Sequence, residues 1–290
     1  MEFKKLSVKN GKVSLKYQLY SELESKLKNR EVIIKVDKAG ICRTDIFVAN
    51  GLIPVEKETT LGHEFSGTIF NSKSLNFNVG DYVVVNPIFK DNSMFGLEHD
   101  GCFSEFIIVN EDQVYKFPSN LNSKLAAYIE PLAASLAPLK SKFISKDNLG
   151  AVLGENRIGQ LTYSIMKKNG YNIKLIENTE NIPDCYFDYV IETLPNKKIF
   201  DEISRILKLN GTLIIKSRLR NYIEINLYNY LKKEIIIESL YYHNFDYSIN
   251  YAINNYNDFI HLFGEEFFIE DWEKAFHLSE KGDKKIFFKF

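Results

Sequence analysis

The chain has 290 residues, of which 45% are hydrophobic and 26% are charged, and its formal net charge is -1 at pH 7. This length is sufficient for two domains with substantial cores. The near balance of charge argues against a nucleic-acid binder with a basic surface and against a polybasic membrane anchor. No apolar run approaches the ~18 residues of a membrane-spanning helix.

Two further features bear on the compartment. The first residues lack the apolar core and cleavage site of a signal peptide. The three cysteines are too few for a disulfide framework in a chain of this length. We therefore expect a soluble globular protein in the reducing cytoplasm, with no nucleic acid or membrane as partner.

The first part of the chain has the pattern of a β-rich domain. Short runs of apolar and β-branched residues are bounded by Gly, Asp, Asn or Pro, which is typical of strands separated by turns. The expected strands are 31–36, 82–85 and 106–109. Short strands with frequent turns indicate a barrel-like antiparallel domain.

From about residue 125 the pattern changes to alternating helices and strands. Apolar residues recur at helical spacing over 125–143, where Pro131 and Pro138 are possible kinks or boundaries. A strand, a glycine turn, a helix and a second strand then follow within some thirty residues, which predicts a βαβ unit with a parallel strand pair. The later elements continue this order. In sequence, the expected elements are strand 149–153, helix 161–166, strand 172–176, strand 189–191, helix 199–207, turn 210–211, strands 212–215 and 234–238, helix 272–278 and strand 285–288.

Four residues have the side-chain types that bind zinc. Cys42 lies in the segment Gly-Ile-Cys-Arg-Thr-Asp, His63 and Glu64 follow about twenty residues later, and Glu130 precedes a proline. Cys42 and His63 each have a simpler explanation, because free cysteines are often small buried residues and a single histidine is more often structural than a ligand. The spacing alone leaves these alternatives open.

The turn 154–159 is a candidate phosphate-binding turn. It follows a strand and precedes a helix, as a dinucleotide-binding fingerprint requires, but Asn156 replaces the middle glycine that normally lets a pyrophosphate approach the backbone. Glu177 ends the next strand, where a carboxylate can accept hydrogen bonds from ribose hydroxyls and would repel a 2′-phosphate. The alternatives are an ordinary strand–helix turn and a solvated acid.

A resemblance to a known family covers most of the chain. In order and composition, seven segments resemble those of the zinc-dependent medium-chain dehydrogenase/reductases, and the Glu-Pro-Leu segment resembles the polyol, threonine and glucose dehydrogenase branch. The segments that carry the resemblance are 40–45, 61–67, 79–83, 100–106, 130–133, 207–213 and 269–276.

The resemblance implies a fold of the class α/β plus β. A GroES-like β-barrel catalytic domain would comprise residues 1–132 and 244–290. A shortened Rossmann-type parallel-sheet cofactor domain would comprise residues 133–243.

The resemblance also implies roles for individual residues. Zinc would be bound by Cys42, His63 and a carboxylate, Glu64 or Glu130, directly or through water. Thr44 would relay the alcohol proton, and Asp45 would orient the site rather than react; together with Glu64 these make up the catalytic set. The cofactor-binding residues would be Arg43, Gly154, Asn156, Arg157, Ile158, Gly159 and Glu177.

The chain departs from the family in two places. The loop 88–99 replaces the lobe that usually carries four cysteines around a structural zinc, so we expect one catalytic zinc and no structural zinc. Cys102 and Cys185 are then interpreted as packing residues. Between Glu177 and Tyr189 there are too few residues for a crossover helix and another strand, which predicts that the third strand of the Rossmann sheet is missing.

Taken together, these features predict a zinc-dependent oxidoreductase that transfers a hydride between a secondary alcohol and a nicotinamide cofactor, NAD rather than NADP. The alcohol would be a polyol, a sugar or a sugar derivative, and the fold does not identify it. The alternative is a degenerate member that binds zinc without redox turnover and serves as a binding or partner subunit. From the family we also expect a homodimer or homotetramer, with the edge strand 234–238 at the interface.

Overall fold

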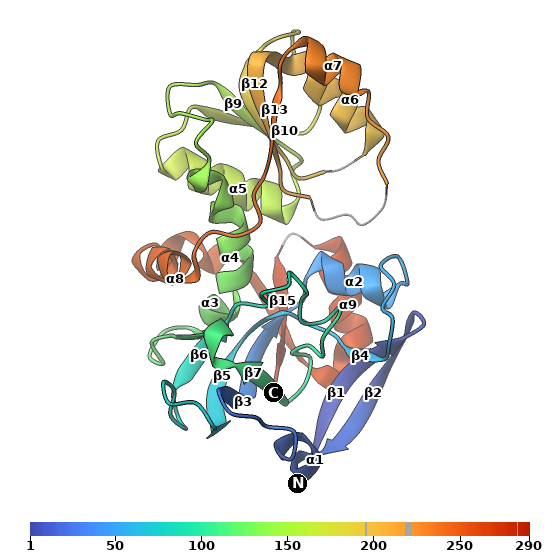
Figure 1. Cartoon of the computed structure of the whole chain (residues 1–290), viewed down its shortest axis with the longest axis vertical. Helices are drawn as coiled ribbons and strands as arrows, with labels where there is room; N and C mark the ends of the chain where they lie inside the picture. The colour runs from blue at the N-terminus through green and yellow to red at the C-terminus, as the bar shows by residue number, and fades with distance from the viewer. Residues whose placement is uncertain (195, 218–221, 283) are drawn as a thin grey trace. The chain divides into compact units, whose positions relative to one another are not determined.

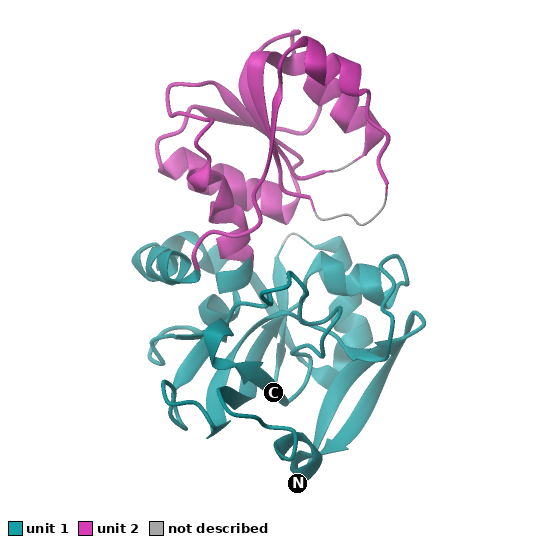
Figure 2. Cartoon of the chain, viewed as in Figure 1, with its two compact units in different colours: residues 1–130, 245–290 teal, residues 131–244 magenta. Residues whose placement is uncertain are grey.

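The computed structural model describes residues 1–194, 196–217, 222–282 and 284–290. The chain forms two compact units, one of residues 1–130 and 245–290 and one of residues 131–244 (Figure 2). We call them the barrel unit and the sheet unit. None of the helices in the described ranges has the length and apolar character needed to cross a bilayer.

The barrel unit is mainly β-structure (Figure 1). Its strands are β1 (Glu2–Lys9), β2 (Lys12–Leu19), β3 (Glu31–Gly40), β4 (Thr59–Thr60), β5 (Glu64–Ser72), β6 (Tyr82–Val85), β7 (Phe106–Asn110), β8 (Val114–Lys116), β14 (Phe263–Phe268) and β15 (Lys285–Lys289). Its helices are α1 (Tyr20–Glu24), α2 (Arg43–Ala49), α3 (Ser123–Ala127), α8 (Phe245–Asn254) and α9 (Trp272–Lys281), together with the start of α4 (Ile129–Leu136).

Strand β3 is the centre of the larger sheet in this unit. The sheet has the order β14-β15-β3-β5-β6-β8, and β7 also pairs with β3. Apart from the parallel pair β14–β15, its strands are antiparallel. The register places Gly40, at the end of β3, opposite Glu64 on one side and Phe287 on the other. Segments far apart in sequence are thereby brought together at this end of β3.

A second, three-stranded sheet has the order β2-β1-β4 and was not expected from the sequence. Strands β1 and β2 form a hairpin in which Lys9 pairs with Lys12. The two turn residues, Asn10 and Gly11, have φ angles of +50° and +69°. An Asn-Gly pair favours such a turn, so the local sequence did contain a hairpin signal.

The sheet unit contains one five-stranded parallel sheet of order β10-β9-β11-β12-β13. Its strands are β9 (Gly150–Leu153), β10 (Ile173–Ile176), β11 (Phe187–Glu192), β12 (Leu207–Ile215) and β13 (Ile236–Ser239). Its helices are most of α4, then α5 (Arg157–Lys168), α6 (Lys197–Ile206) and α7 (Leu227–Lys232).

Helices cover both faces of this sheet. Val152 of β9 packs in one cluster with Met166 of α5, whereas its neighbours in β9 pack in another cluster with Phe200 of α6 and Tyr230 of α7. Because successive side chains of a strand point to opposite faces, α5 lies on one face and α6 and α7 on the other. This is the doubly wound arrangement of Rossmann-type sheets.

The helical pattern over 125–143 forms α3, α4 and a 3₁₀ turn (Ala137–Lys140). Of the two prolines expected as kinks or boundaries, Pro131 lies in the first turn of α4 and Pro138 lies in the 3₁₀ turn. The expected turn 210–211 lies inside β12, where Asn210 has a φ of +59° and the pairing with β11 changes register. The parallel pairing continues on both sides of this irregularity. The turn signal is therefore expressed as a break within the strand, with the left-handed φ of a turn residue at Asn210, rather than as the end of the strand.

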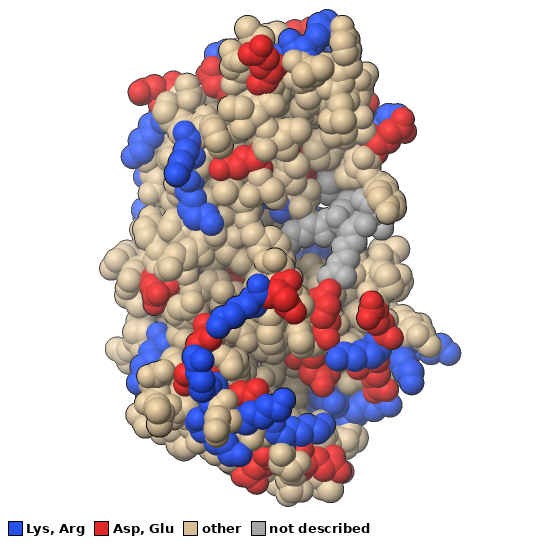
Figure 3. All heavy atoms as spheres, viewed as in Figure 1, with Lys and Arg blue, Asp and Glu red and all other residues tan. Residues whose placement is uncertain are grey.

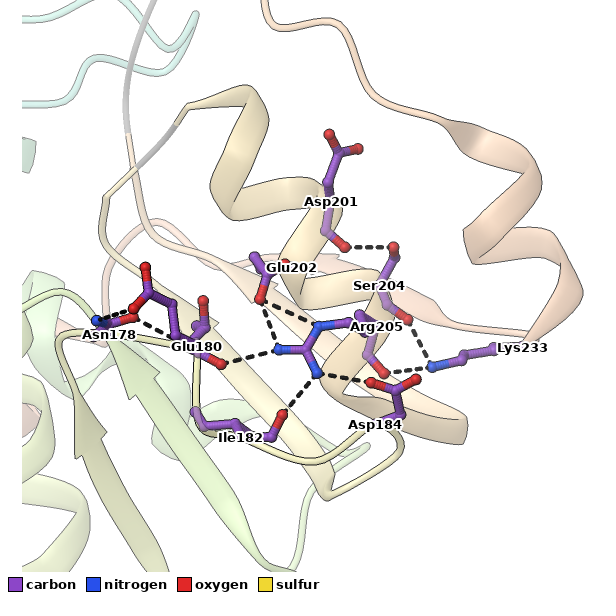
Figure 4. Close-up of polar contacts among 10 residues, drawn as sticks. Asn178, Glu180, Ile182, Asp184, Asp201, Glu202, Ser204, Arg205 and Lys233 are labelled. Atoms are coloured by element: carbon purple, nitrogen blue, oxygen red, sulfur yellow. Dashed lines mark hydrogen bonds and ion pairs between the residues drawn. The ribbon is translucent and has the colours of Figure 1, made fainter.

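The segment 177–186 connects β10 directly to β11, with no helix or strand in it. Arg205 of α6 holds this connection: its guanidinium donates to the carbonyl oxygens of Thr179 and Ile182 and pairs with Asp184 and Glu202 (Figure 4). Next to it, the ammonium group of Lys233 donates to three carbonyl oxygens at the end of α6, each at 2.7 Å. In the described part of the chain, β10 is thus an edge strand of the sheet, and side-chain contacts secure the segment beside it.

On the face shown in Figure 3, acidic and basic side chains are interspersed, in keeping with the near-zero net charge.

Candidate functional site

The first candidate site begins where β3 passes into α2. Cys42 precedes the first residue of α2 and takes its N-cap position. The buried carboxylate of Asp45, in the first turn of the helix, accepts a hydrogen bond from the Cys42 amide at 2.8 Å and one from the Gly62 amide at 3.2 Å. An acidic side chain at this position accepts hydrogen bonds from amides that have no partner within the helix. Its negative charge also interacts favourably with the positive end of the helix dipole.

Asp45 also contacts the histidine of the second motif. Its Oδ1 lies 3.2 Å from Nδ1 of His63, and both side chains are 1% exposed. One carboxylate thus positions the cysteine backbone, the Gly62 turn and the imidazole ring. Gly62 has a φ of +94°, and a Cβ there would lie 2.3 Å from the Phe103 ring, so this turn requires glycine.

Three potential ligands converge beside Asp45. The Sγ of Cys42, a ring nitrogen of His63 and a carboxylate oxygen of Glu64 all lie within 4.8 Å of one another. Ligands of a single tetrahedral zinc ion are separated by roughly 3.5 Å, given metal–ligand distances of about 2.0–2.3 Å. Small side-chain adjustments would therefore bring the three onto one ion.

Lys285 is a residue of this cluster that the sequence analysis missed. Its ammonium group pairs with Oε2 of Glu64, and the two side chains are 7% and 1% exposed. A Cβ at Gly40 would lie 2.6 Å from Glu64 Oε2 and 2.8 Å from Lys285 Cε, so the glycine makes room for the pair. Nothing in the local sequence marks Lys285, because only the order β15-β3-β5 brings it to Glu64.

The electrostatics of the cluster reflect its burial. Burial disfavours the charged form of His63, but the adjacent Asp45 carboxylate and the Cys42 thiol outweigh it and raise the pKa of His63 in the metal-free protein. Burial raises the pKa of Glu64, Lys285 opposes this, and the nearby Glu130 carboxylate adds to the increase. Three carboxylates, an imidazole and a thiol thus share one low-dielectric environment with the ammonium group of Lys285.

The other residues expected at this site lie on α2 and α4. Glu130 is in the first turn of α4, is 5% exposed and lies close enough to influence the pKa of Glu64. Thr44 is half-buried in the first turn of α2, whereas Arg43 is exposed. The structure therefore gathers Cys42, His63 and Glu64, with Glu130 near the last of them.

Zinc is the metal that the resemblance implies, and the side chains present fit it. Neither ring nitrogen of His63 makes an aligned hydrogen bond in the described part of the chain. An imidazole buried without such partners, beside a thiol and a carboxylate, is a donor set suited to zinc. Asp45 beside Nδ1 is the kind of contact that orients a metal-binding histidine.

The second candidate site is the turn between β9 and α5. Asn156 is the N-cap of α5, and its side-chain oxygen accepts hydrogen bonds from the amides of Ile158 and Gly159 at 3.1 and 3.2 Å. Gly154 has a φ of +109°, and a Cβ at Gly159 would lie 1.9 Å from the Gly154 carbonyl oxygen. The first and third glycines of the motif thus serve the tight turn and the close packing of the helix.

The remaining residues assigned to cofactor binding surround this turn. Arg157 is half-buried in the first turn of α5. Glu177 is exposed and directly follows Ile176, which pairs with Leu153 at the end of β9. The carboxyl ends of β9 and β10 therefore place Glu177 and Gly154 at the same edge of the sheet, where ligands of such folds bind.

The two remaining cysteines differ from each other. Cys102 is fully buried, and burial raises the pKa of its thiol well above the usual value. Cys185 is exposed, so its interpretation as a packing residue is wrong. It lies in the β10–β11 connection with a φ of +52°, a turn position that faces solvent.

Comparison with known proteins relates this chain to dehydrogenases. Residues 28–119 match the family model of the alcohol dehydrogenase GroES-like domain. Among curated relatives, sorbitol dehydrogenase of Halalkalibacterium halodurans is 29% identical over 189 residues, or 56% of this chain and 55% of the relative. The (R,R)-butanediol dehydrogenase of Bacillus subtilis is 33% identical over 174 residues, or 51% of this chain and 50% of the relative.

The alignments with these curated relatives thus span about half of their length. A likeness over the whole chain comes from solved structures. The 2R,3R-butanediol dehydrogenase of Bacillus subtilis superposes with a TM-score of 0.85 at 22% identity over 99% of both chains. Residues 28–119 are therefore an alcohol dehydrogenase GroES-like domain, in a chain that has the medium-chain dehydrogenase fold, a GroES-like domain with a Rossmann-type parallel sheet, throughout.

Proposed function

We propose that this protein is a zinc-dependent dehydrogenase that oxidises a secondary alcohol, such as a polyol or sugar derivative, with a nicotinamide cofactor. The observation that carries the proposal is the convergence of Cys42, His63 and Glu64 within 4.8 Å of one another. The relatives named for sorbitol and butanediol support an alcohol of this class.

In this proposal, Cys42, His63 and a carboxylate hold one zinc ion, which supplies Lewis-acid polarisation of the alcohol oxygen. Glu64 is the carboxylate that lies in the cluster, and Glu130 is the second candidate. Asp45 keeps His63 and the Cys42 backbone in place through the contacts described above. The hydroxyl of Thr44, which is half-buried, would accept the alcohol proton and release its own proton to solvent.

The nicotinamide cofactor supplies the hydride acceptor. We assign its binding to the 154–159 turn, to Arg157 and Ile158 at the start of α5, and to Arg43 as a phosphate contact. The carboxylate of Glu177 would accept hydrogen bonds from the ribose hydroxyls and disfavour a 2′-phosphate, so we propose NAD in preference to NADP. A single zinc ion per chain, a cytoplasmic location and a homodimer or homotetramer complete the proposal.

The test compares two cysteine variants. Cys42→Ala removes a proposed zinc ligand, whereas Cys185→Ala removes an exposed thiol and serves as the matched control. We expect the first to lose its zinc and more than about a hundredfold in turnover of 2,3-butanediol or sorbitol with NAD, and the second to retain both. Metal analysis and NADH formation are the readouts. Full turnover by a zinc-free Cys42→Ala protein would refute the proposed mechanism.

The cofactor preference has its own test. Replacing Glu177 by serine removes the carboxylate but retains a hydrogen-bonding group. We expect kcat/KM with NADP to rise relative to that with NAD by about tenfold, the factor that corresponds to ~1.4 kcal/mol. An unchanged ratio would show that Glu177 does not contact the ribose.

A further inference from the structure

The amide side chain of Asn156 has four hydrogen bonds. Its Oδ1 accepts from the amides of Ile158 and Gly159, and its Nδ2 donates to the carbonyl oxygen and the hydroxyl of Thr193, both at 3.0 Å. An asparagine side chain has two donors and two acceptor positions. The hydrogen-bonding capacity of this amide is therefore filled by the protein itself.

Thr193 makes this arrangement rigid. It directly follows β11 and is 8% exposed, and its hydroxyl donates to the Leu153 carbonyl oxygen at 2.7 Å. A Cβ at Gly154 would lie 2.7 Å from this hydroxyl and 3.0 Å from Asn156 Nδ2. The end of β9, the end of β11 and the Asn156 side chain are thus packed together at the point where the chain order of the sheet reverses.

This is also the position that the phosphates of a dinucleotide occupy in Rossmann-type folds. The middle glycine of the motif lets the pyrophosphate approach the backbone, and the helix amides then face the phosphate oxygens. Here the Asn156 side chain stands where that glycine would be, and its oxygen already holds two of those amides. We infer that Asn156 competes from within the protein with the cofactor pyrophosphate and sets the affinity of the sheet unit for dinucleotides.

This inference rests on the proposed function, because it concerns the cofactor site assigned there. It predicts a weakened site rather than a closed one. An anionic phosphate is a stronger acceptor than a neutral amide and can displace it from the helix amides. Displacement costs the two bonds between Nδ2 and Thr193, so the net gain on binding is reduced.

The experiment measures binding of NADH, ADP and adenosine by calorimetry to the full-length wild type and to Asn156→Gly. Glycine at an N-cap is well tolerated, and it restores the middle glycine of the motif. We expect NADH and ADP to bind at least about tenfold more tightly to the variant, because two helix amides are released. Adenosine, which lacks phosphate, should show no gain.

Two further variants control for the loss of a helix cap as such and for poor folding of Asn156→Gly. Asn226, the N-cap of α7, accepts from the Tyr228 amide at 3.2 Å. Asn226→Gly therefore removes an equivalent cap at the other side of the same sheet and should leave the dissociation constants unchanged. Asn156→Ser keeps a shorter cap and should give an intermediate gain in affinity, which preserves the test if the glycine variant is poorly folded.

The outcomes separate this inference from the proposed function. Equal or weaker NADH binding by Asn156→Gly, with binding by the wild type intact, would overturn the inference, and weaker binding would point to Asn156 as a cofactor contact. In both cases the proposed function would stand. A gain for adenosine equal to that for ADP would overturn it as well. No NADH binding by any of the proteins would overturn both the inference and the cofactor part of the proposed function.

Discussion

The two candidate sites are built in the same way but differ in how far the protein itself satisfies their hydrogen-bonding groups. Each lies at the start of a helix, and each is organised by a polar side chain that satisfies free amides: Asp45 at α2 and Asn156 at α5. At α2 the arrangement leaves the buried ring nitrogens of His63 without aligned hydrogen bonds in the described part of the chain. At α5 every hydrogen-bonding position of the Asn156 amide is used.

This difference has an energetic consequence. A buried imidazole nitrogen without an aligned hydrogen bond lowers the stability of a fold until a ligand satisfies it, whereas a self-satisfied network carries no such cost. We therefore expect the metal-free barrel unit to be destabilised at this cluster, and the cofactor-free sheet unit to have no comparable cost at the Asn156 turn. Four changes test this contrast, from the largest expected effect to the smallest.

The largest effect is expected for Lys285→Met. In the presence of a chelator the change leaves the Glu64 carboxylate buried without its cation, which costs about 3–5 kcal/mol of unfolding free energy. Zinc should recover most of the loss, because a metal ion replaces the missing positive charge. Urea denaturation with and without zinc measures both quantities.

The control for Lys285→Met is Lys281→Met, which removes an exposed lysine from α9. It should change the unfolding free energy little under either condition. An equal loss for Lys285→Met with and without zinc would show that Lys285 stabilises the strand itself rather than the charge of the cluster.

Zinc itself should stabilise the wild type by a smaller amount. At a free zinc concentration one hundred times its dissociation constant, the expected gain is about 2.7 kcal/mol. Hydrogen exchange should locate the added protection at 42–46 and 61–64, with the amides of the sheet unit unchanged. Protection spread equally over both units would contradict the contrast drawn between them.

Arg205→Met tests whether side-chain contacts within the sheet unit stabilise the β10–β11 connection in the absence of a ligand. The change removes the hydrogen bonds from the guanidinium to Thr179, Ile182, Asp184 and Glu202. Hydrogen bonds to charged groups contribute about 1.5–3 kcal/mol, and we expect a loss within this range. Exchange of the amides in 178–186 should accelerate.

The matched change is Lys197→Met, which breaks an ion pair with Glu224 whose side chains are 58% and 83% exposed. Such exposed pairs contribute about 0–1 kcal/mol, so this variant should resemble the wild type. If the two variants were equally stable, the Arg205 contacts would not be what holds the β10–β11 connection.

The smallest expected effect is the loss of stability at acidic pH that arises from Glu202. The hydrogen bond and charge of Arg205 hold the pKa of Glu202 below its usual range. A lowered pKa contributes stability above the unfolded-state value, which is lost as the pH falls through the folded-state value. Because the pair is partly exposed, we expect no more than about 1 kcal/mol.

Urea midpoints between pH 6 and pH 3 measure the Glu202 contribution. Glu202→Gln should be less stable than the wild type at pH 6 and should approach it at pH 3. A constant difference across this range would mean that the carboxylate charge does not contribute.

Much of the fold could be predicted from local pattern. The strand 82–85 is β6, and the βαβ order of 149–176 appears as β9, α5 and β10. These elements follow from side-chain periodicity, which the backbone geometry imposes residue by residue. Local pattern did not predict what pairing between distant strands decided: Asn210 has the φ of a turn residue, yet the pairing of β12 with β11 continues beyond it.

The candidate sites divide in the same way. The residue types at Cys42, His63 and Glu64 indicated a metal site, and the glycine spacing of 154–159 indicated a phosphate turn, because ligand chemistry and backbone freedom are properties of single residues. By itself, the sequence thus determined which groups were available and in which elements they lie.

What those groups contact depends on how the strands are ordered in space. Lys285 reaches Glu64 because β3 lies between β15 and β5, and because Gly40 leaves space between them. Thr193 reaches Asn156 because β9 and β11 are neighbours in the sheet although about forty residues separate them in the chain. Both contacts depend on strand order, a property that no local stretch of sequence contains, and they leave one site in need of a ligand and the other satisfied.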